Sequence, residues 1–336
     1  MTVAGSADEV TNAPEVGAPA SYSETSLPEL PKLGGLFAKG VAGGVSKRPK
    51  GAVRLPEVSY RVAHVDTAGE AAHLAAYLRL LGEPASDVLP AGFLHVLAFP
   101  LATALMVRGD FPLPLLGMVH LKNAARVLRP VRLGDTVEVR AWSQDARPHR
   151  RGVQVDLVAE VLVDGDLAYR AVSTYLAKGF TAPDAAPSSD GATPADAATP
   201  ADESPREEWT PPLPTARWKL GAGTGRAYGA VSGDLNPIHT SSLGAKAFGF
   251  PRAIAHGMYS AARALAEVGP ARRGAAYEWT VEFFKPVLLP GTVDVSIRYT
   301  SDAATDEGAT HEPGFVYDGW RSGKNTRHFT GTVTPL

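Results

Sequence analysis

The chain contains no cysteine among its 336 residues. This absence excludes disulfide bonds, a thiolate nucleophile, cysteine-ligated zinc and cysteine-ligated iron–sulfur clusters. It is typical of a protein from a reducing compartment, where disulfides rarely form. We therefore expect a cytoplasmic protein whose chemistry depends on other side chains.

The chain also lacks a surplus of either charge. Its 33 Lys and Arg residues nearly balance its 35 Asp and Glu residues, and the formal net charge is −2. Because no basic excess is available to neutralise phosphates, we expect no nucleic-acid partner. Hydrophobic residues make up 44% of the chain and charged residues 20%, which is typical of a globular protein.

No segment has the features of a signal peptide or of a membrane anchor. Residues 1–20 lack the basic start and the apolar stretch of a secretory signal. Residues 88–107 contain no Asp, Glu, Lys or Arg, but Pro90, His95 and Pro100 lie among them. A buried central helix, kinked or interrupted near Pro100, explains this run, and we expect no membrane span.

Composition divides the chain into four parts. Residues 1–50 are rich in Ala, Gly, Pro and Ser and show no sustained period, which predicts a disordered tail. Residues 179–210 are of low complexity, with a near-repeat of Ala-Thr-Pro-Ala-Asp, and predict a disordered linker. Residues 51–178 and 211–336 are therefore expected to form two folded domains.

Periodic patterns in both halves predict helices together with antiparallel strands. In the first half they predict helices over 70–81, ended by Gly82, and over about 90–107, with strands over 60–65, 118–128, 136–144, 154–163 and 167–177. In the second half they predict a helix from Met258 to about 268, with strands over 276–284, 291–299, 314–320 and 328–333. Asp164-Gly165 predicts a hairpin turn. The fold class is therefore α+β.

The two halves carry matching segments in the same order. Residues 129–139, RPVRLGDTVEV, align with residues 285–295, KPVLLPGTVDV. Residues 90–96, PAGFLHV, align less closely with residues 251–257, PRAIAHG. We infer an internal duplication that pairs as a pseudo-dimer within one chain. A further homodimer is left open.

The chemistry-bearing residues concentrate in residues 228–258. Asp234 and His239 flank the pair Asn236-Pro237, which favours a helix start with Asn as N-cap and Pro at the first position. This arrangement can direct both side chains at one small object, such as a water. A capping aspartate beside a packed histidine is the structural alternative.

Gly257 lies at the expected start of an apolar helix. An N–H group there has no partner within the helix and points along the positive end of the helix dipole, so it can stabilise a developing oxyanion. The alternative is a glycine needed only for packing. The neighbouring His256 is more often a packed or supporting residue than a catalyst.

The duplication is asymmetric. The first half has no counterpart of residues 232–239, and it has Val96 where the alignment places Gly257. Residues 51–178 are therefore predicted to be non-catalytic and free to shape a binding cavity, with one active site in residues 211–336.

Residues 228–258 resemble the signature of the MaoC-like R-specific enoyl-thioester hydratases. The string runs Tyr228, two residues, VSGDLNPIH over 231–239, five residues and a small residue, with AHGM over 255–258 following. The chain resembles the two-domain 3-hydroxyacyl-thioester dehydratases of the actinobacterial type, closely over about residues 220–300 and more weakly, as a degenerate repeat, over about 55–178. The resemblance implies a double hot-dog fold, in which each long helix is wrapped by an antiparallel sheet.

The same resemblance implies the roles of the site residues. Asp234 and His239 would form the catalytic dyad, Gly257 would be the oxyanion donor and Asn236 a supporting residue. Ser232, Tyr228 and His256 would surround them. The reaction would be reversible addition of water to a trans-2-enoyl thioester of CoA or of an acyl carrier protein, with no metal and no cofactor beyond the substrate's own phosphopantetheine. A hot-dog thioesterase and a non-catalytic acyl-thioester-binding subunit remain as alternatives.

Overall fold

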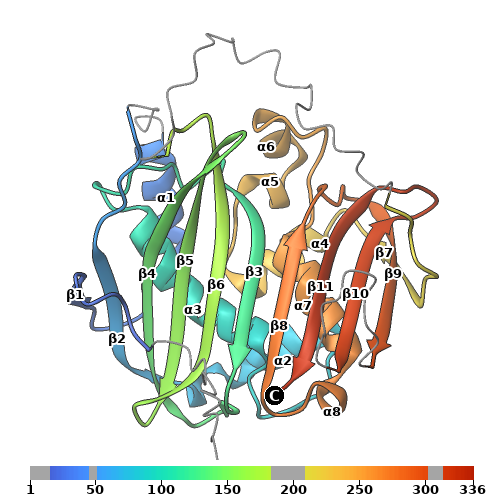
Figure 1. Cartoon of the computed structure of the whole chain (residues 1–336), viewed down its shortest axis with the longest axis horizontal. Coiled ribbons are helices and arrows are strands. Elements are labelled where there is room, and N and C mark those ends of the chain that lie inside the picture. The colour runs from blue at the N-terminus through green and yellow to red at the C-terminus, as the bar shows by residue number, and fades with distance from the viewer. Residues whose placement is uncertain (1–15, 45–50, 183–208, 302–312) are drawn as a thin grey trace, which may run out of the picture.

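The computed structural model describes residues 16–44, 51–182, 209–301 and 313–336, and its strands form a single curved sheet (Figure 1). The strands are β1 (Ser23–Ser26), β2 (Val58–Asp66), β3 (Val119–Val127), β4 (Thr136–His149), β5 (Gly152–Val163), β6 (Asp166–Lys178), β7 (Ala216–Leu220), β8 (Tyr277–Phe283), β9 (Gly291–Thr300), β10 (Gly314–Arg321) and β11 (Arg327–Pro335). Their order across the sheet is β1-β2-β4-β5-β6-β3-β8-β11-β10-β9-β7.

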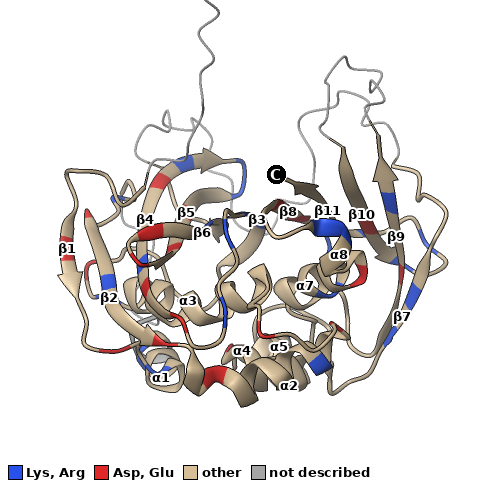
Figure 2. Cartoon of the chain, turned by 90° about the horizontal axis from the view of Figure 1, so that it is seen from below, with Lys and Arg blue, Asp and Glu red and all other residues tan. Residues whose placement is uncertain are grey.

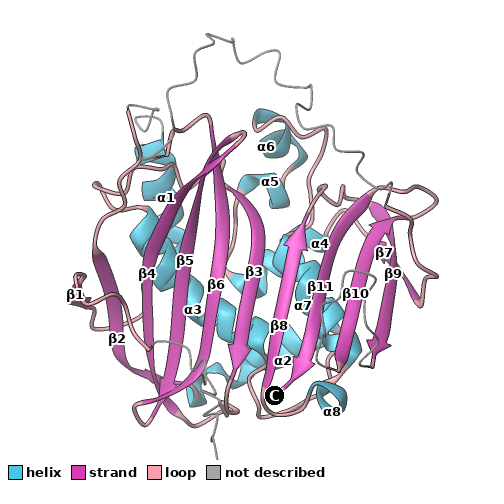
Figure 3. Cartoon of the chain, viewed as in Figure 1, coloured by secondary structure: helices cyan, strands magenta, loops and turns pink. Residues whose placement is uncertain are grey.

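Helices cover one face of this sheet (Figure 3). They are α1 (Leu33–Gly44), α2 (Ala71–Leu81), α3 (Ala91–Met106), α4 (Thr224–Ser232), α5 (Pro237–Thr240), α6 (Ser242–Ala247), α7 (Gly257–Val268) and α8 (Pro270–Arg273), with a 3-10 turn, η1 (Ala68–Glu70), before α2. The predicted strands and the helices over 70–81 and 258–268 are confirmed, and Gly82 ends α2 in the left-handed region at φ 73°. Asp164 and Gly165 both have positive φ, as the predicted hairpin turn requires.

The strand order shows the duplication directly. Apart from β1, which adds to the edge of β2, each half has five strands. Each half places its first, third, fourth, fifth and second strands in that order from the edge inward, and β3 meets β8 at the centre. The β3–β8 pair is antiparallel, with Ala124 opposite Thr280 and Ala125 opposite Trp279. A long helix lies against each half, α3 in the first and α7 in the second (Figure 2). This is the double hot-dog arrangement that the resemblance implies.

The apolar run at residues 88–107 forms a central helix, as predicted. α3 carries no charged side chain and most of its residues are buried, with Phe93, Leu94 and Leu101 fully so. It continues through Pro100, so the alternative of an interruption there is wrong. Packing on both sides of the helix compensates for the hydrogen bond that proline cannot donate. None of the described helices combines the length and the apolarity of a membrane span.

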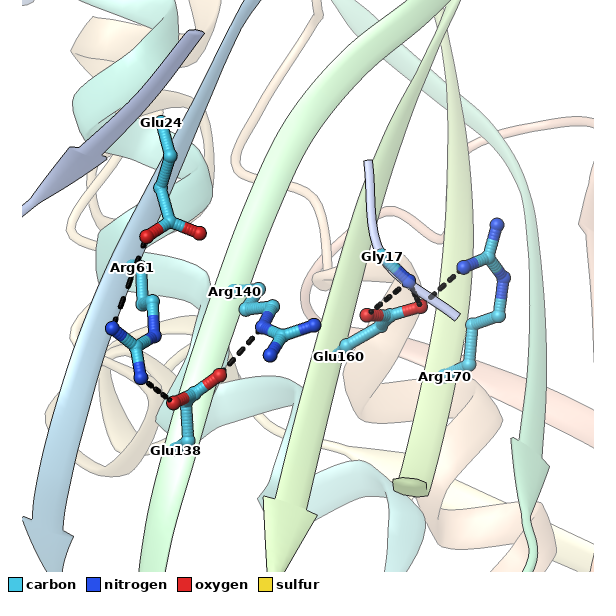
Figure 4. Close-up of polar contacts among 7 residues, drawn as sticks. All are labelled: Gly17, Glu24, Arg61, Glu138, Arg140, Glu160 and Arg170. Atoms are coloured by element: carbon cyan, nitrogen blue, oxygen red, sulfur yellow. Dashed lines mark hydrogen bonds and ion pairs between the residues drawn. The ribbon is translucent and has the colours of Figure 1, made fainter. Parts of the chain in front are cut away.

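The prediction of a disordered tail is wrong for residues 16–44. The free edge of β2 pairs in parallel with β1, and Leu36 of α1 is buried. The Gly17 N–H donates to both carboxylate oxygens of Glu160 at 3.1 Å, and Glu24 lies 3.8 Å from Arg61 (Figure 4). Contacts with distant strands therefore order a segment whose own periodicity is weak.

Other parts of the predicted division are not tested. Residues 1–15 and 45–50 of the predicted tail, and residues 183–208 of the predicted linker, lie outside the described residues. The separation into two independent domains, 51–178 and 211–336, stays a prediction, because the described parts of both halves share one sheet.

A buried ion pair joins the two halves on the helical side. Arg273, at the end of α8, contacts Glu83, which follows α2, and both side chains are at least nine-tenths buried. Replacing Glu83 by Ala leaves a buried guanidinium without its partner, and we expect a loss of about 3–5 kcal/mol in the free energy of unfolding. Urea unfolding followed by tryptophan fluorescence measures this loss.

The matched control is the exposed pair Arg129–Asp166, whose side chains are 38% and 76% exposed. Asp166→Ala should cost less than about 1 kcal/mol. Equal losses in the Glu83 and Asp166 variants would show that the buried pair does not stabilise the junction.

Candidate active site

Asp234 lies between α4 and α5, where hydrogen bonds hold both its backbone and its carboxylate. Gly233 ends α4 in the left-handed region at φ 72° and turns the chain. The Asp234 N–H donates to the Ser232 hydroxyl at 3.2 Å, and the Asn236 N–H donates to Asp234 Oδ1 at 3.1 Å. These short-range bonds leave Oδ2 for contacts with other groups.

Asn236 and Pro237 start α5 as predicted. The Asn236 side chain caps the helix by accepting the Ile238 N–H at 3.3 Å, and Pro237 occupies the first helical position. The Asn236 backbone carbonyl accepts the His239 N–H at 3.0 Å. The turn therefore places His239 a fixed short distance beyond Asp234.

His239 has a defined tautomer. Its Nδ1 lies 2.9 Å from the Ile254 carbonyl oxygen, which can only accept, so Nδ1 carries the proton and Nε2 carries the lone pair. Burial lowers the pKa of His239 below 6.5, and the Asp234 charge opposes this effect only in part. His239 is therefore a neutral imidazole with an available base nitrogen.

His256 packs against the dyad but is not a member of it. Its ring stacks on His239, with centroids 3.7 Å apart, and its Nε2 donates to the Asp234 backbone carbonyl at 2.9 Å. Burial lowers the pKa of His256 to about 3, so this ring too is neutral. Tyr228, which is buried, packs behind it with a centroid distance of 5.0 Å. Both residues lie where they can fix the loop of Asp234.

Gly257 is the first residue of α7, as predicted. Its N–H belongs to the first turn, which has no carbonyl partners within the helix. A Cβ built on Gly257 would lie 2.9 Å from Cζ of Phe283. The glycine therefore keeps a narrow space open beside a helix N-terminus.

The aligned position in the first half has a different environment. Val96 is the sixth residue of α3, so its N–H lies within the helix and is used by the helical hydrogen-bond ladder. Val96 therefore differs from Gly257 in offering no free N–H. The side chain is not the only cause, because α3 begins about five residues earlier than α7 when residues 90–96 are aligned with residues 251–257.

One cavity of about 430 Å³ brings these groups together. All seven residues singled out from the sequence line it: Tyr228, Ser232, Asp234, Asn236, His239, His256 and Gly257. Its other wall comes from the first half, including Val96, Phe99 and Leu115, and from Phe37 of α1. The first half therefore shapes the cavity in which the second half presents its polar groups.

Sequence patterns missed several groups that line or complete this cavity. Phe37 belongs to a segment predicted to be disordered, and the Ile254 carbonyl acts through its backbone, which leaves no mark in the sequence. His95 lies in a run that the sequence predicts to be a buried helix, and His120 and Tyr175 lie on strands whose alternation does not distinguish a cavity from a core.

Three side chains could in principle hold a metal ion. The ligand atoms of Asp234, His239 and His256 lie within 4.8 Å of one another. His256 Nε2 donates its proton to a backbone carbonyl, and a protonated nitrogen cannot coordinate a cation, whereas its Nδ1 is buried and has no hydrogen-bond partner among the described residues. The same spacing suits one water held between Asp234 and His239. Two groups that each hydrogen-bond one water at about 2.8 Å lie roughly 4–5 Å apart. The expectation that no metal is used stays a prediction.

Comparisons with known proteins agree with this architecture. Residues 203–312 match the family model of the MaoC-like domain. The 3-hydroxyacyl-thioester dehydratase X of Mycobacterium tuberculosis is 37% identical over 226 residues, which are 67% of this chain and 75% of that protein.

Solved structures extend the likeness to most of the chain. The crystal structure of HtdX from Mycobacterium tuberculosis superposes with a TM-score of 0.66 at 32% identity, covering 83% of this chain and 100% of that one. A MaoC-like dehydratase from Phytophthora capsici, at 17% identity, shares the fold with a TM-score of 0.56 and covers 87% of this chain and 98% of that one. The chain belongs to the MaoC-like dehydratase family and has its double hot-dog fold.

Proposed function

We propose that this protein is a hydro-lyase that reversibly hydrates trans-2-enoyl thioesters to R-3-hydroxyacyl thioesters. The observation that carries the proposal is the neutral His239 base nitrogen close to the Asp234 carboxylate, in one cavity with the first N–H groups of α7. A 3-hydroxyacyl-thioester dehydratase that is 37% identical supports the same reaction class.

In the hydration direction, Asp234 and His239 hold one water between them. His239 Nε2 removes a proton as the water oxygen adds to C3 of the substrate. One proton passes from the dyad to C2, so the dyad regains its starting state and the atoms balance. Because both groups lie on one side of the substrate, water adds with syn geometry.

Charge that develops on the thioester oxygen needs a donor. The Gly257 N–H lies at the positive end of the α7 dipole, where an enolate oxygen is stabilised. Asn236 supports the reaction indirectly, because its N–H holds Asp234 Oδ1 and its side chain caps α5. Ser232, Tyr228 and His256 position the dyad from behind.

The substrate is an acyl thioester of CoA or of an acyl carrier protein, and the reaction uses the phosphopantetheine of that substrate rather than a separate cofactor. Three basic side chains that line the cavity, Arg151, Lys178 and Lys285, are exposed and suit a phosphate-bearing carrier. Thioester cleavage, the activity of the alternative thioesterase, is measured as release of free thiol from the same substrates.

Removing either member of the dyad should abolish most of the activity. Asp234→Asn and His239→Ala should each lower kcat for enoyl-CoA hydration by about 10²–10⁴-fold, since each removes a group that handles a proton. The loss of absorbance of the enoyl thioester measures the rate. His64→Ala, on the exposed side of β2, is the control. A dyad variant with full activity would contradict the assignment.

The oxyanion role can be separated from the steric role of Gly257. Gly257→Ala keeps the N–H and adds a methyl group towards Phe283, whereas Gly257→Pro also removes the N–H at a helix position that tolerates proline. His256 already has the extended backbone that precedes proline, φ −62° and ψ 138°. We expect kcat to be about 10²-fold lower for Pro than for Ala. Equal rates would remove the N–H from the mechanism.

The pH profile follows from the neutral state of His239. Because burial lowers the pKa of His239, its base form persists below pH 6.5, the ordinary value for histidine. The acid limb of kcat/KM, which reports the free enzyme, should therefore lie below pH 6.5, with activity falling as His239 gains a proton. Initial rates over a pH series test this, and a limb centred at or above 6.5 would contradict the proposed base.

A further inference from the structure

A second polar cluster lines the same cavity from the first half. It consists of His95 on α3, His120 on β3 and Tyr175 on β6. None of the three belongs to the proposed dyad, and among the described residues none forms a hydrogen bond with Asp234 or His239. They are uncommon side chains for the wall of a site that receives an acyl chain, because an alkyl chain cannot satisfy them.

The three rings form one stacked group. His120 lies on Tyr175 with centroids 4.5 Å apart and planes at 14°, and His95 lies 6.4 Å from His120 at the same angle. Phe283, the residue that limits the space beside Gly257, packs on His120 at 5.2 Å. The cluster is therefore coupled by packing to the wall where the thioester carbonyl is proposed to sit.

His120 presents an unused acceptor. Its Nε2 is buried and has no hydrogen-bond partner among the described residues. Burial lowers the pKa of His120, and a hydrogen bond with the Lys122 backbone opposes this effect in part. Because Nε2 has no partner, that bond falls on Nδ1, and a bond that favours the protonated ring is one that the ring donates, so Nδ1 carries the proton. A bulge between His120 and Lys122 breaks the register of β3 with β6 at this point. A hydrogen-bond donor on a bound molecule would therefore satisfy the lone pair of His120 Nε2.

All three groups are uncharged. Burial lowers the pKa of His95 to about 4 and that of His120 to about 3, and burial raises the pKa of the Tyr175 phenol. The Asp234 charge also raises the pKa of His95 and Tyr175, which places the cluster within electrostatic reach of the proposed reaction centre. Neutral imidazoles beside a phenol suit a neutral polar group rather than a carboxylate or a phosphate.

We propose that His95, His120 and Tyr175 recognise a hydroxyl group on the acyl chain beyond C3, so that the enzyme acts on hydroxylated enoyl thioesters in preference to plain alkyl ones. A hydroxyl group donates to His120 Nε2, and its oxygen accepts from the Tyr175 phenol. A keto group offers no proton to His120. This inference names the substrate class of the proposed function and rests on it for the reaction, although the binding it describes does not require catalysis.

The first experiment measures binding without turnover. Saturated acyl-CoA thioesters of equal chain length, with no substituent, with one hydroxyl or with one keto group at successive carbons beyond C3, are titrated by calorimetry. We expect at least one hydroxylated ligand to bind about tenfold more tightly than its plain and keto counterparts, since the plain chain leaves buried polar groups unpartnered.

Two conservative variants assign the preference. His120→Phe retains the stacking on Tyr175 and Phe283, and Tyr175→Phe removes one oxygen. Each should bring the ratio of hydroxylated to plain affinity close to one, while plain ligands bind as tightly as before or more tightly. His64→Phe, an exposed histidine on β2, should leave the ratio unchanged. Thermal unfolding of each variant confirms that it is folded.

Three outcomes would overturn the inference: a wild-type ratio near one at every position, a keto ligand that binds best, or variants that weaken all ligands equally. The last result would place the cluster on the pantetheine arm that all the ligands share. Hydration assays with the matching enoyl thioesters then separate the two proposals. Selective binding without hydration would contradict the proposed function alone, and hydration without selectivity would contradict this inference alone.

Discussion

The antiparallel pairing of β3 with β8 is the interaction on which the described structure depends. It joins two repeated halves edge to edge, so that two sheets become one and two helices, α3 and α7, lie side by side on one face of it (Figure 2). An unpaired strand at that position would expose its backbone groups in each half. The cavity exists because of this junction, since its walls come from both halves.

Duplication allowed the two halves to specialise. The second half interrupts its helical layer after α4, and the resulting turn holds Asp234 and His239 before α7 begins at Gly257. The first half instead extends α3 backwards through the aligned position, so that Val96 sits inside a helix and offers no free N–H. A longer helix in one half and a polar turn in the other explain why one active site is proposed for each chain.

Four histidines of the cavity are each held in the neutral form. The Ile254 carbonyl fixes the proton of His239 on Nδ1, and the Asp234 carbonyl fixes that of His256 on Nε2. Burial keeps both rings neutral. The same principle holds on the opposite wall, where burial keeps His95 and His120 neutral. A neutral, preorganised cavity suits a substrate whose charge appears only during the reaction.

The sequence by itself determined the local features. The Asn236 cap, the Pro237 helix start, the Gly82 helix end and the Asp164 hairpin depend on residues a few positions apart, so their residue types predict them. The periodic patterns of helices and strands also predicted the α+β class, and the repeated segments predicted two halves of similar build.

Only the tertiary structure decided what depends on distant contacts. Ordering of residues 16–44 relies on the edge of β2 and on Glu160, far along the chain. The tautomer of His239 relies on a carbonyl 15 residues away, and the cluster of His95, His120 and Tyr175 on three separate elements. Such contacts arise when strands and helices pack, and no short-range pattern encodes which backbone oxygen or ring will lie opposite a given side chain.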